Sequence, residues 1–308
     1  MIKAEGLTKR HGDKLAVDGL SFTVEPGVIT GFLGPNGAGK STTMRMIMGL
    51  DSPTSGSVTV NGKPFAEHRR PLAEVGALLE ARAVHTGRSA RNHLLAMAAT
   101  AGISTKRVDE VIGMVGLGEV AGRRAGAFSL GMGQRLGIAS ALLADPQTLI
   151  LDEPVNGLDP DGVRWIRNLL KGLADEGRTV FLSSHLMSEM ALTADHIILV
   201  GKGRLLRDQS MADFIAGASA DVVTVRSPQA GRLAGLLAGP DVTVRDIAEQ
   251  TLEVEGLTSD HIGRTAGAAG IILLELAPHA ASLEEAYMAL TEESVDYRST
   301  VEFTEDAA

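Results

Sequence analysis

The sequence contains no cysteine, which excludes disulfide scaffolds, thiolate metal sites and cysteine nucleophiles. Aromatic residues make up only 3% of the 308 residues, with a single Trp, so we expect a core of aliphatic side chains. No run of about 18 apolar residues occurs, and the first residues lack the apolar segment of a signal peptide. We therefore expect a cytoplasmic chain that does not itself insert into a membrane.

Apolar residues make up 44% of the chain and charged residues 22%, which is enough apolar material for two packed domains at about 150 residues per domain. The charge is unevenly divided. Residues 1–216 carry 24 Lys/Arg and 22 Asp/Glu, whereas residues 217–308 carry 5 and 16, a net charge of −11. This places a domain boundary near Gly217. An acidic domain repels a phosphate backbone, so we expect no nucleic-acid partner.

The first 216 residues alternate short apolar runs with helical stretches. The apolar runs predict buried strands at 28–33, 148–154, 179–184 and 196–200. Residues 42–50 and the stretch 89–143 predict helices, the second broken near Gly116 and Gly131. Alternating residues that close on Asn61-Gly62 predict a hairpin. Strands alternating with helices predict an α/β fold with a parallel sheet covered on both faces.

After Gly217 the pattern is that of a small α+β domain. Alternating residues predict strands at 221–227, 242–247, 251–256 and 271–276. Helical composition predicts helices at 229–237, 258–269 and 283–293. The residues beyond Asp296 are polar, and we expect a loose tail there.

A glycine-rich loop lies between a predicted strand and a predicted helix. It satisfies G-x-x-x-x-G-K-[ST] and, with the next residue, reads Gly34, Pro35, Asn36, Gly37, Ala38, Gly39, Lys40, Ser41 and Thr42. Glycines let backbone N–H groups surround a phosphate, and the helix that follows adds its positive N-terminal end. We expect Lys40 to bind the β- and γ-phosphates of a nucleotide and the Ser41 hydroxyl to ligate Mg²⁺.

Two carboxylates follow the predicted strand at 148–151. Asp152 and Glu153 would lie at its carboxyl end, which is where parallel sheets bind ligands. We expect Asp152 to hold Mg²⁺ or its water and Glu153 to polarise the attacking water.

The segment 127–160 and the residues after it resemble the ABC-type ATPases. The signature motif of that family is matched by Phe128-Ser129-Leu130-Gly131-Met132, and the strand with its two carboxylates follows. Asn156-Gly157-Leu158-Asp159 and then His185 come next in the order the family has. The resemblance covers about residues 1–216. It implies a P-loop NTPase fold with a helical subdomain at about 85–140.

The same resemblance implies roles for individual residues. His185 would act with Glu153 in catalysis, and Asp159 would belong to the D-loop. The signature of one chain would contact the nucleotide of another through Ser129, Leu130, Gly131 and Met132.

Four positions depart from the family pattern. Leu130 and Met132 replace the usual signature residues, and His11 lies where an aromatic ring often stacks on adenine. Glu80 takes the place of the Q-loop glutamine, where it would be a metal ligand with Ser41. These departures imply looser selectivity for the base and slower hydrolysis or altered coupling.

The resemblance further implies how the protein works. Two chains would enclose ATP and Mg²⁺ head to tail, so the partner is a second copy or a sister ATPase subunit. Both would attach, at the inner face of the cell membrane, to a separate multi-helix permease. The N-terminal pattern, Glu80 and the acidic α+β region are similar to the ATPase subunits of multidrug, antibiotic-resistance and lantibiotic-immunity exporters.

An alternative is a soluble ABC ATPase that clamps a macromolecule. Such proteins usually carry two cassettes, zinc-binding cysteines or a long coiled coil, and the sequence has none of these. An ordinary phosphotransferase would leave residues 127–135 without a role. The transported substrate and the role of residues 217–308 stay open.

Overall fold

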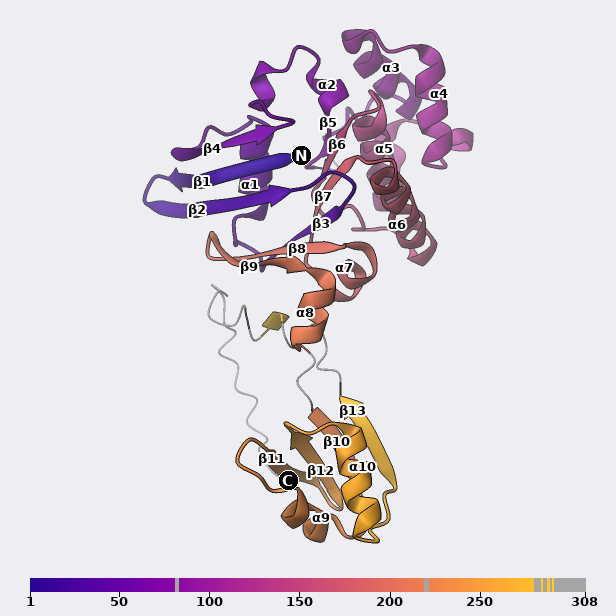
Figure 1. Ribbon diagram of the computed structural model, residues 1–308. Helices are drawn as coiled ribbons and strands as arrows, with labels where there is room; N and C mark the ends of the chain where they lie inside the picture. The colour runs from indigo at the N-terminus through magenta and orange to yellow at the C-terminus, as the bar shows by residue number, and fades with distance from the viewer. Residues whose placement is uncertain (81–82, 219–221, 280–283, 285–286, 289, 291–308) are drawn as a thin grey trace, which may run out of the picture. The chain divides into compact units, whose positions relative to one another are not determined.

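The computed structural model describes residues 1–80, 83–218 and 222–279, together with residues 284, 287, 288 and 290 (Figure 1). The chain divides into two compact units, Met1–Ser210 and Met211–Leu290, here called the N-terminal and the C-terminal unit. Helix α8 (Met211–Ala218) spans the composition change near Gly217, so the structural division precedes the change in charge. The loose tail expected beyond Asp296 lies outside the described residues.

Among residues 1–80 and 83–210, six strands form a sheet in the order β5-β6-β7-β3-β8-β9. The strands are β3 (Ile29–Leu33), β5 (Val75–Leu78), β6 (Thr148–Leu151), β7 (Thr179–Ser184), β8 (His196–Gly201) and β9 (Arg204–Ser210). The first five in this order are parallel, and β9 is antiparallel to β8. Every residue of β3, β6 and β7 is buried, as strands covered on both faces require. The predicted α/β fold is confirmed.

A second sheet of the N-terminal unit was not anticipated from the sequence. Within the same described ranges, β1 (Ile2–His11), β2 (Lys14–Val24) and β4 (Ser55–Val60) form an antiparallel sheet in the order β2-β1-β4. It packs on the larger sheet and on α1 (Lys40–Ile47) through a shared core. Figure 1 shows it in indigo and purple beside β3 and β7.

Three phenylalanines lie in the shared core of the two sheets. Phe22 of β2, Phe32 of β3 and Phe181 of β7 have ring centroids 5.1–5.9 Å apart. Aromatic pairs at this separation add stability beyond the area they bury.

The tight turn predicted at Asn61-Gly62 is present, but no second strand follows it to complete a hairpin. Both residues have positive φ, and Val60 and Lys63 form a bridge across the turn. Strand β4 nevertheless pairs with β1, far away in the sequence, because β1 presents the apolar partners. After the turn the chain forms two short helices, η1 (Phe65–Glu67) and α2 (Pro71–Glu74).

The helical region contains α3 (Ala90–Ala101), α4 (Thr105–Met114) and α5 (Leu130–Leu142). Each begins after a serine whose side chain accepts a hydrogen bond from a backbone N–H three residues later; these are Ser89, Ser104 and Ser129. The break near Gly116 is confirmed, since α4 ends at Met114. The break at Gly131 is wrong, because the Ser129 cap starts α5 one residue earlier. Two further helices, α6 (Pro160–Asp175) and α7 (Met187–Thr193), flank β7 in the sequence.

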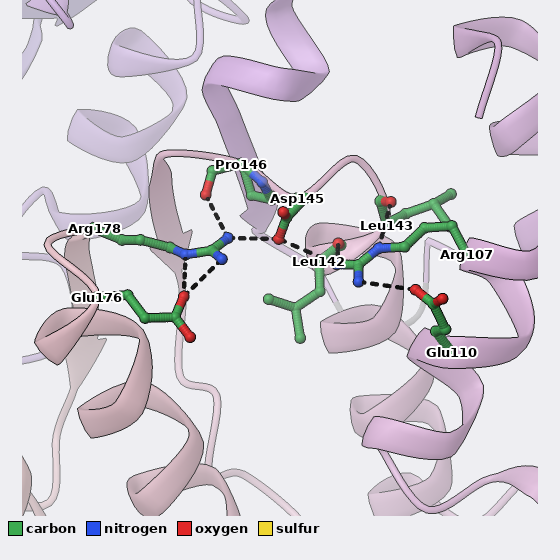
Figure 2. A network of polar contacts seen from close by, with 8 residues as sticks. All are labelled: Arg107, Glu110, Leu142, Leu143, Asp145, Pro146, Glu176 and Arg178. Carbon is green, nitrogen blue, oxygen red and sulfur yellow. Dashed lines mark hydrogen bonds and ion pairs between the residues drawn. The ribbon is translucent and has the colours of Figure 1, made fainter. Parts of the chain in front are cut away.

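A polar network ties the helical region to the larger sheet (Figure 2). Arg107 of α4 donates to the carbonyl oxygens of Leu142 (3.0 Å) and Leu143 (3.4 Å) at the end of α5, and to Asp145 (3.3 Å). The same carboxylate oxygen of Asp145 accepts from Arg178, at 2.7 Å. Since Asp145 precedes β6 and Arg178 precedes β7, the network fixes the entry of the chain into both strands.

Residues 222–279 form a four-stranded antiparallel sheet in the order β11-β12-β10-β13 with two helices. The elements are β10 (Val222–Arg226), α9 (Ala230–Leu237), β11 (Thr243–Ala248), β12 (Thr251–Glu255), α10 (Ser259–Ala268) and β13 (Glu275–His279). Buried residues of both helices and of β10 and β12 form one core. The predicted α+β pattern of strands and helices is therefore found over these residues.

Two elements predicted for the C-terminal unit differ from the structure or lie largely outside the described residues. The strand predicted at 271–276 begins only at Glu275, because Ile271 packs under α10 while Ile272 and Leu274 are exposed. The helix predicted at 283–293 lies largely outside the described residues. None of the helices described here combines the length and the apolar character that crossing a bilayer would require.

Candidate functional site

The glycine-rich loop joins the end of β3 to the start of α1. Gly39 has a φ of 97°, and a Cβ there would lie 2.5 Å from the carbonyl oxygen of Ala16. At Gly34 a Cβ would overlap the carbonyl oxygen of Val200. Only glycine fits these two positions, so the loop backbone can curve into an anion-binding concavity at the N-terminus of α1.

Lys40 lies at the inner end of this loop. Its side chain is buried, and its Nζ donates to the carbonyl oxygens of Gly34 (2.5 Å) and Pro35 (3.2 Å). Burial lowers the pKa of Lys40, and the nearby carboxylates of Glu153 and Asp152 oppose that change. A phosphate in the loop would favour the charged form of this ammonium group.

Asp152 connects the loop to the neighbouring strands. Its Oδ2 accepts a hydrogen bond from the Ser41 hydroxyl at 2.7 Å, and its Oδ1 accepts a short one from the Ser183 hydroxyl of β7. The Ser183 hydroxyl also accepts from the backbone N–H of Glu153, at 3.0 Å. These contacts bring the predicted residues Ser41, Asp152 and Glu153 together.

The oxygen atoms of Ser41 and Asp152 suit a hard divalent cation. No group of three or more His, Asp or Glu side chains in the described part of the chain could hold a metal ion by itself. A cation at this place therefore needs phosphate or water oxygens to complete its coordination, which is how Mg²⁺ is commonly bound.

Glu153 and His185 form an interacting pair. The Nδ1 atom of His185, just after β7, lies 2.9 Å from Oε2 of Glu153. The backbone of Glu153 has a φ of 50°, which is strained for a residue with a Cβ. Its carbonyl oxygen accepts a hydrogen bond from the buried Gln134 of α5 at 3.0 Å. Gln134 and Ser183 thus hold the strained backbone that aims this carboxylate.

A cavity of about 400 Å³ lies over the loop. Twelve described residues line it: His11, Lys14, Ala16, Pro35, Asn36, Gly37, Gly39, Lys40, Ser41, Thr42, Asp152 and Glu153. All but two of the residues predicted to bind a nucleotide are in this set. The exceptions are Gly34, which lies against Val200, and Ala38, whose carbonyl oxygen accepts a hydrogen bond from Gly203. The volume is in the range of small-molecule sites.

Glu80 lies outside the set that lines the cavity. It is exposed and follows the end of β5, and the backbone N–H of Asp152 donates to Leu78 of that strand at 2.7 Å. Glu80 and Asp152 therefore share an edge of the sheet. A role for Glu80 as a metal ligand stays a prediction.

The signature residues do not line the cavity of their own chain either. Ser129 caps α5, and its hydroxyl accepts from the N–H of Met132 at 3.3 Å. Leu130 is half exposed, and a Cβ on Gly131 would lie 2.7 Å from the carbonyl oxygen of Gly157. This close approach packs the signature against the segment 156–159.

Asp159 has a structural partner within the chain. Its carboxylate caps α6 by accepting from the N–H of Gly162 at 2.9 Å, and Pro160 is the first residue of the helix. The carboxylate thereby fixes the loop that supports the signature.

Four residues of the site were missed by sequence reasoning. Lys14 and Ala16 reach the cavity from β2, in a sheet that was not anticipated. Ser183 follows the apolar residues of the predicted strand 179–184, so its place at a carboxyl end was a usable signal. Gln134 carried no signal beyond its position after the signature.

Comparison with known proteins bears on the identity of this site. The family described as "ABC transporter" matches residues 17–156, and a domain of unknown function matches residues 221–284. The bacitracin transport ATP-binding protein BcrA of Bacillus licheniformis is 45% identical over 211 residues, which is 68% of this chain and 69% of that protein. The lantibiotic transport ATP-binding protein SrtF of Streptococcus pyogenes is 36% identical over 68% of this chain and 90% of its own length.

The solved structure of an ATP-binding cassette is similar to this chain in both fold and sequence. A dimeric, post-hydrolysis state of the ATP-binding cassette MJ0796, bound to ADP and Pi, superimposes with a TM-score of 0.62 and 25% identity. The match covers 68% of this chain and 99% of that cassette. Taken with the loop, the cavity and the paired carboxylates, these matches show that the chain belongs to the ABC transporter family, as one of its subunits that bind and hydrolyse ATP.

Proposed function

We propose that this subunit powers a membrane exporter of antibiotics or peptides, with two copies, or one copy and a sister subunit, enclosing ATP between them. The names of the two relatives, a bacitracin and a lantibiotic transport protein, support the substrate class. Residues 1–216 would be the ATPase domain, with a helical subdomain at about 85–140, and residues 217–308 an accessory domain. Neither name supports the alternative of a soluble clamp on a macromolecule.

The single observation that carries the catalytic proposal is the connected set of side chains at the inner end of the cavity. Ser41, Asp152 and Ser183 are joined by hydrogen bonds, and Ser183 also fixes the backbone of Glu153. The phosphates would lie on the backbone N–H groups of residues 36–39 and on Lys40. Glu153 would take the proton of the attacking water as general base, and His185 would orient the Glu153 carboxylate.

We assign the oxygens of Ser41 and Asp152 to Mg²⁺, with Glu80 as a further candidate ligand. When bound, the ion would neutralise charge on the β- and γ-phosphates of ATP. The chain's own part is to hold these oxygens in place, which the hydrogen bonds from Ser183 and Ser41 do.

The position of the signature supports a site shared between two chains. Ser129 and Gly131 lie at the N-terminus of a 13-residue helix but outside the cavity of their own chain. A helix N-terminus binds anions, so this end would contact the γ-phosphate held by another chain. Cleavage of that phosphate removes the bridge, and the two chains separate.

The permease would be a separate multi-helix polypeptide that holds the subunit at the inner face of the membrane. The neighbouring reading frame should encode a protein with about six apolar spans of some 20 residues, and co-expression with that protein tests the proposal. Exporter function requires that the chain move to the membrane fraction only when that partner is present. Recovery in the soluble fraction in both cases would support the clamp instead.

The dimer is tested with Glu153→Gln, which should bind ATP but cleave it very slowly. Light scattering at saturating MgATP should then report a dimer, whereas MgADP should leave monomers. Monomers under both conditions would contradict the shared site. Glu253→Gln, a change in the C-terminal unit, is the matched control and should not accumulate as a dimer.

A further inference from the structure

The cavity over the glycine-rich loop has two chemically different ends. At the inner end, Lys40 and the carboxylates of Asp152 and Glu153 surround the place for the phosphates. The outer end is built by the first two strands, where His11 and Lys14 are paired across β1 and β2. A nucleoside triphosphate whose phosphates occupy the loop must place its base and ribose toward these strands.

The direction of strand β2 places Lys14 at the outer end of the cavity. Ala16 touches the loop, since a Cβ on Gly39 would be 2.5 Å from its carbonyl oxygen. Lys14 is two residues before Ala16, on the same face of β2 and about 7 Å farther from the loop. In the part of the chain that the structure describes, no hydrogen bond or ion pair engages the Lys14 ammonium.

The chemistry of this end distinguishes one purine from the other. An ammonium group donates hydrogen bonds and accepts none. Guanine presents two acceptors, O6 and N7, side by side, and lysine can contact both; adenine presents N7 next to an amino donor. Among the described residues that line the cavity, the carboxylates that could accept from the adenine amino group lie at the phosphate end. Lys14 therefore offers adenine no preference over guanine, and the imidazole of His11, which can donate or accept, fits the edge of either base.

We propose that Lys14 contacts the base of the bound nucleotide and that the site binds and hydrolyses GTP as well as ATP. The proposal rests on the proposed nucleotide site at residues 34–41 and deepens it by naming the substrate class. The His11 ring is small and offers little surface for stacking on the face of the base. Lys14 compensates for this, because its ammonium group binds the acceptor atoms at the edge of the base.

The test is competition between nucleotides in the full chain. ATP and GTP each displace N-methylanthraniloyl-ATP, and steady-state hydrolysis of each is measured in parallel. For the unchanged chain, the two dissociation constants should agree within about threefold, and GTP should be hydrolysed. In Lys14→Met, which keeps the length of the side chain but not its donors, affinity for GTP should fall about tenfold and affinity for ATP less than about threefold.

Two further variants serve as controls. Lys14→Arg keeps donors that can bridge O6 and N7, so it should retain most of the GTP affinity. Lys171→Met, on an exposed part of α6 away from the cavity, should change neither affinity.

Different failures have different meanings. An equal loss for both nucleotides in Lys14→Met would assign Lys14 to the ribose or a phosphate and overturn the proposal. No loss for either nucleotide, or an unchanged chain that rejects GTP, would overturn it as well. An unchanged chain that binds neither nucleotide would instead contradict the proposed nucleotide site itself.

Discussion

The two units of this chain treat polar side chains in opposite ways. Ten polar or charged residues are buried among those described, and all but Ser227 belong to the N-terminal unit. Several of them, including Lys40, Gln134 and Ser183, surround the loop and its carboxylates. Burying a polar group is unfavourable unless it finds a partner. The N-terminal unit therefore keeps these groups where chemistry needs them.

The C-terminal unit places its charges on the surface. Arg245 lies 3.3 Å from Glu253 across β11 and β12, and Arg226 lies 3.5 Å from Glu275 across β10 and β13. All four side chains are on the strand positions that alternate with the apolar core. The comparison shows that the buried polar side chains of Lys40, Gln134 and Ser183 surround the candidate site, whereas the exposed ion pairs of the C-terminal unit surround none.

The largest effect should come from matched carboxylate changes in the two units. Glu153→Gln removes the proposed general base and should lower ATP turnover by about 10²–10⁴-fold, while nucleotide binding is kept. Glu253→Gln breaks an exposed ion pair and should leave turnover within about twofold. Release of phosphate by the purified chain is the measurement. Similar losses in both variants would erase the distinction between the units.

A buried serine in each unit allows a finer comparison. Ser183→Ala leaves the N–H of Glu153 and one oxygen of Asp152 without a partner, which should lower turnover about tenfold and destabilise by about 1–3 kcal/mol. Ser227 accepts from the N–H of Gln229 at 3.1 Å, so Ser227→Ala should destabilise by about 1 kcal/mol. Its turnover should be unchanged. Urea unfolding and phosphate release together check both variants; a normal rate in Ser183→Ala would show that Ser183 does not position the carboxylates.

The inner end of the site could be predicted from the sequence because its signals are local. The loop at 34–41 and the carboxylates at 152–153 each follow a short apolar run, and parallel strands bring their carboxyl ends to one edge. His185 follows another such strand. The confirmed strands β3, β6, β7 and β8 are therefore enough to place these residues near one another.

At the outer end, His11 was predicted but Lys14 was not, because the place of Lys14 depends on how the local hairpin of β1 and β2 packs on the larger sheet. Strand β1 pairs with β2 and with β4, whose residues lie some 50 positions later. Nothing in the sequence of the Asn61-Gly62 turn indicates that the strand before it, β4, pairs with β1. The helix break predicted at Gly131 is wrong because glycine in the first turn of a helix is tolerated when a serine cap precedes it.

Two arginines allow a largely covered guanidinium to be compared with an exposed one. The Arg178 side chain is 15% exposed and donates to Asp145, Glu176 and a carbonyl oxygen, whereas Arg245 is 62% exposed. Arg178→Gln should destabilise the N-terminal unit by about 1–2 kcal/mol, and Arg245→Gln should change stability by less than about 0.5 kcal/mol. The sole Trp, Trp165 of α6, reports unfolding of the N-terminal unit by fluorescence, and circular dichroism reports loss of secondary structure in both units. Equal shifts in stability would show that covering the Arg178 side chain within the network of Figure 2 adds nothing.

The smallest effect concerns pH and the buried ammonium. Burial lowers the pKa of Lys40, and phosphates favour its charged form, so nucleotide binding above that pKa must take up a proton. Affinity for ATP should therefore be constant near neutral pH and weaken as the pH rises toward the ordinary lysine pKa of about 10.4. Displacement of a fluorescent nucleotide measures it. Lys40→Arg, which stays charged throughout this range, should bind less tightly but lose the pH dependence. The same slope in both proteins would mean that another group titrates.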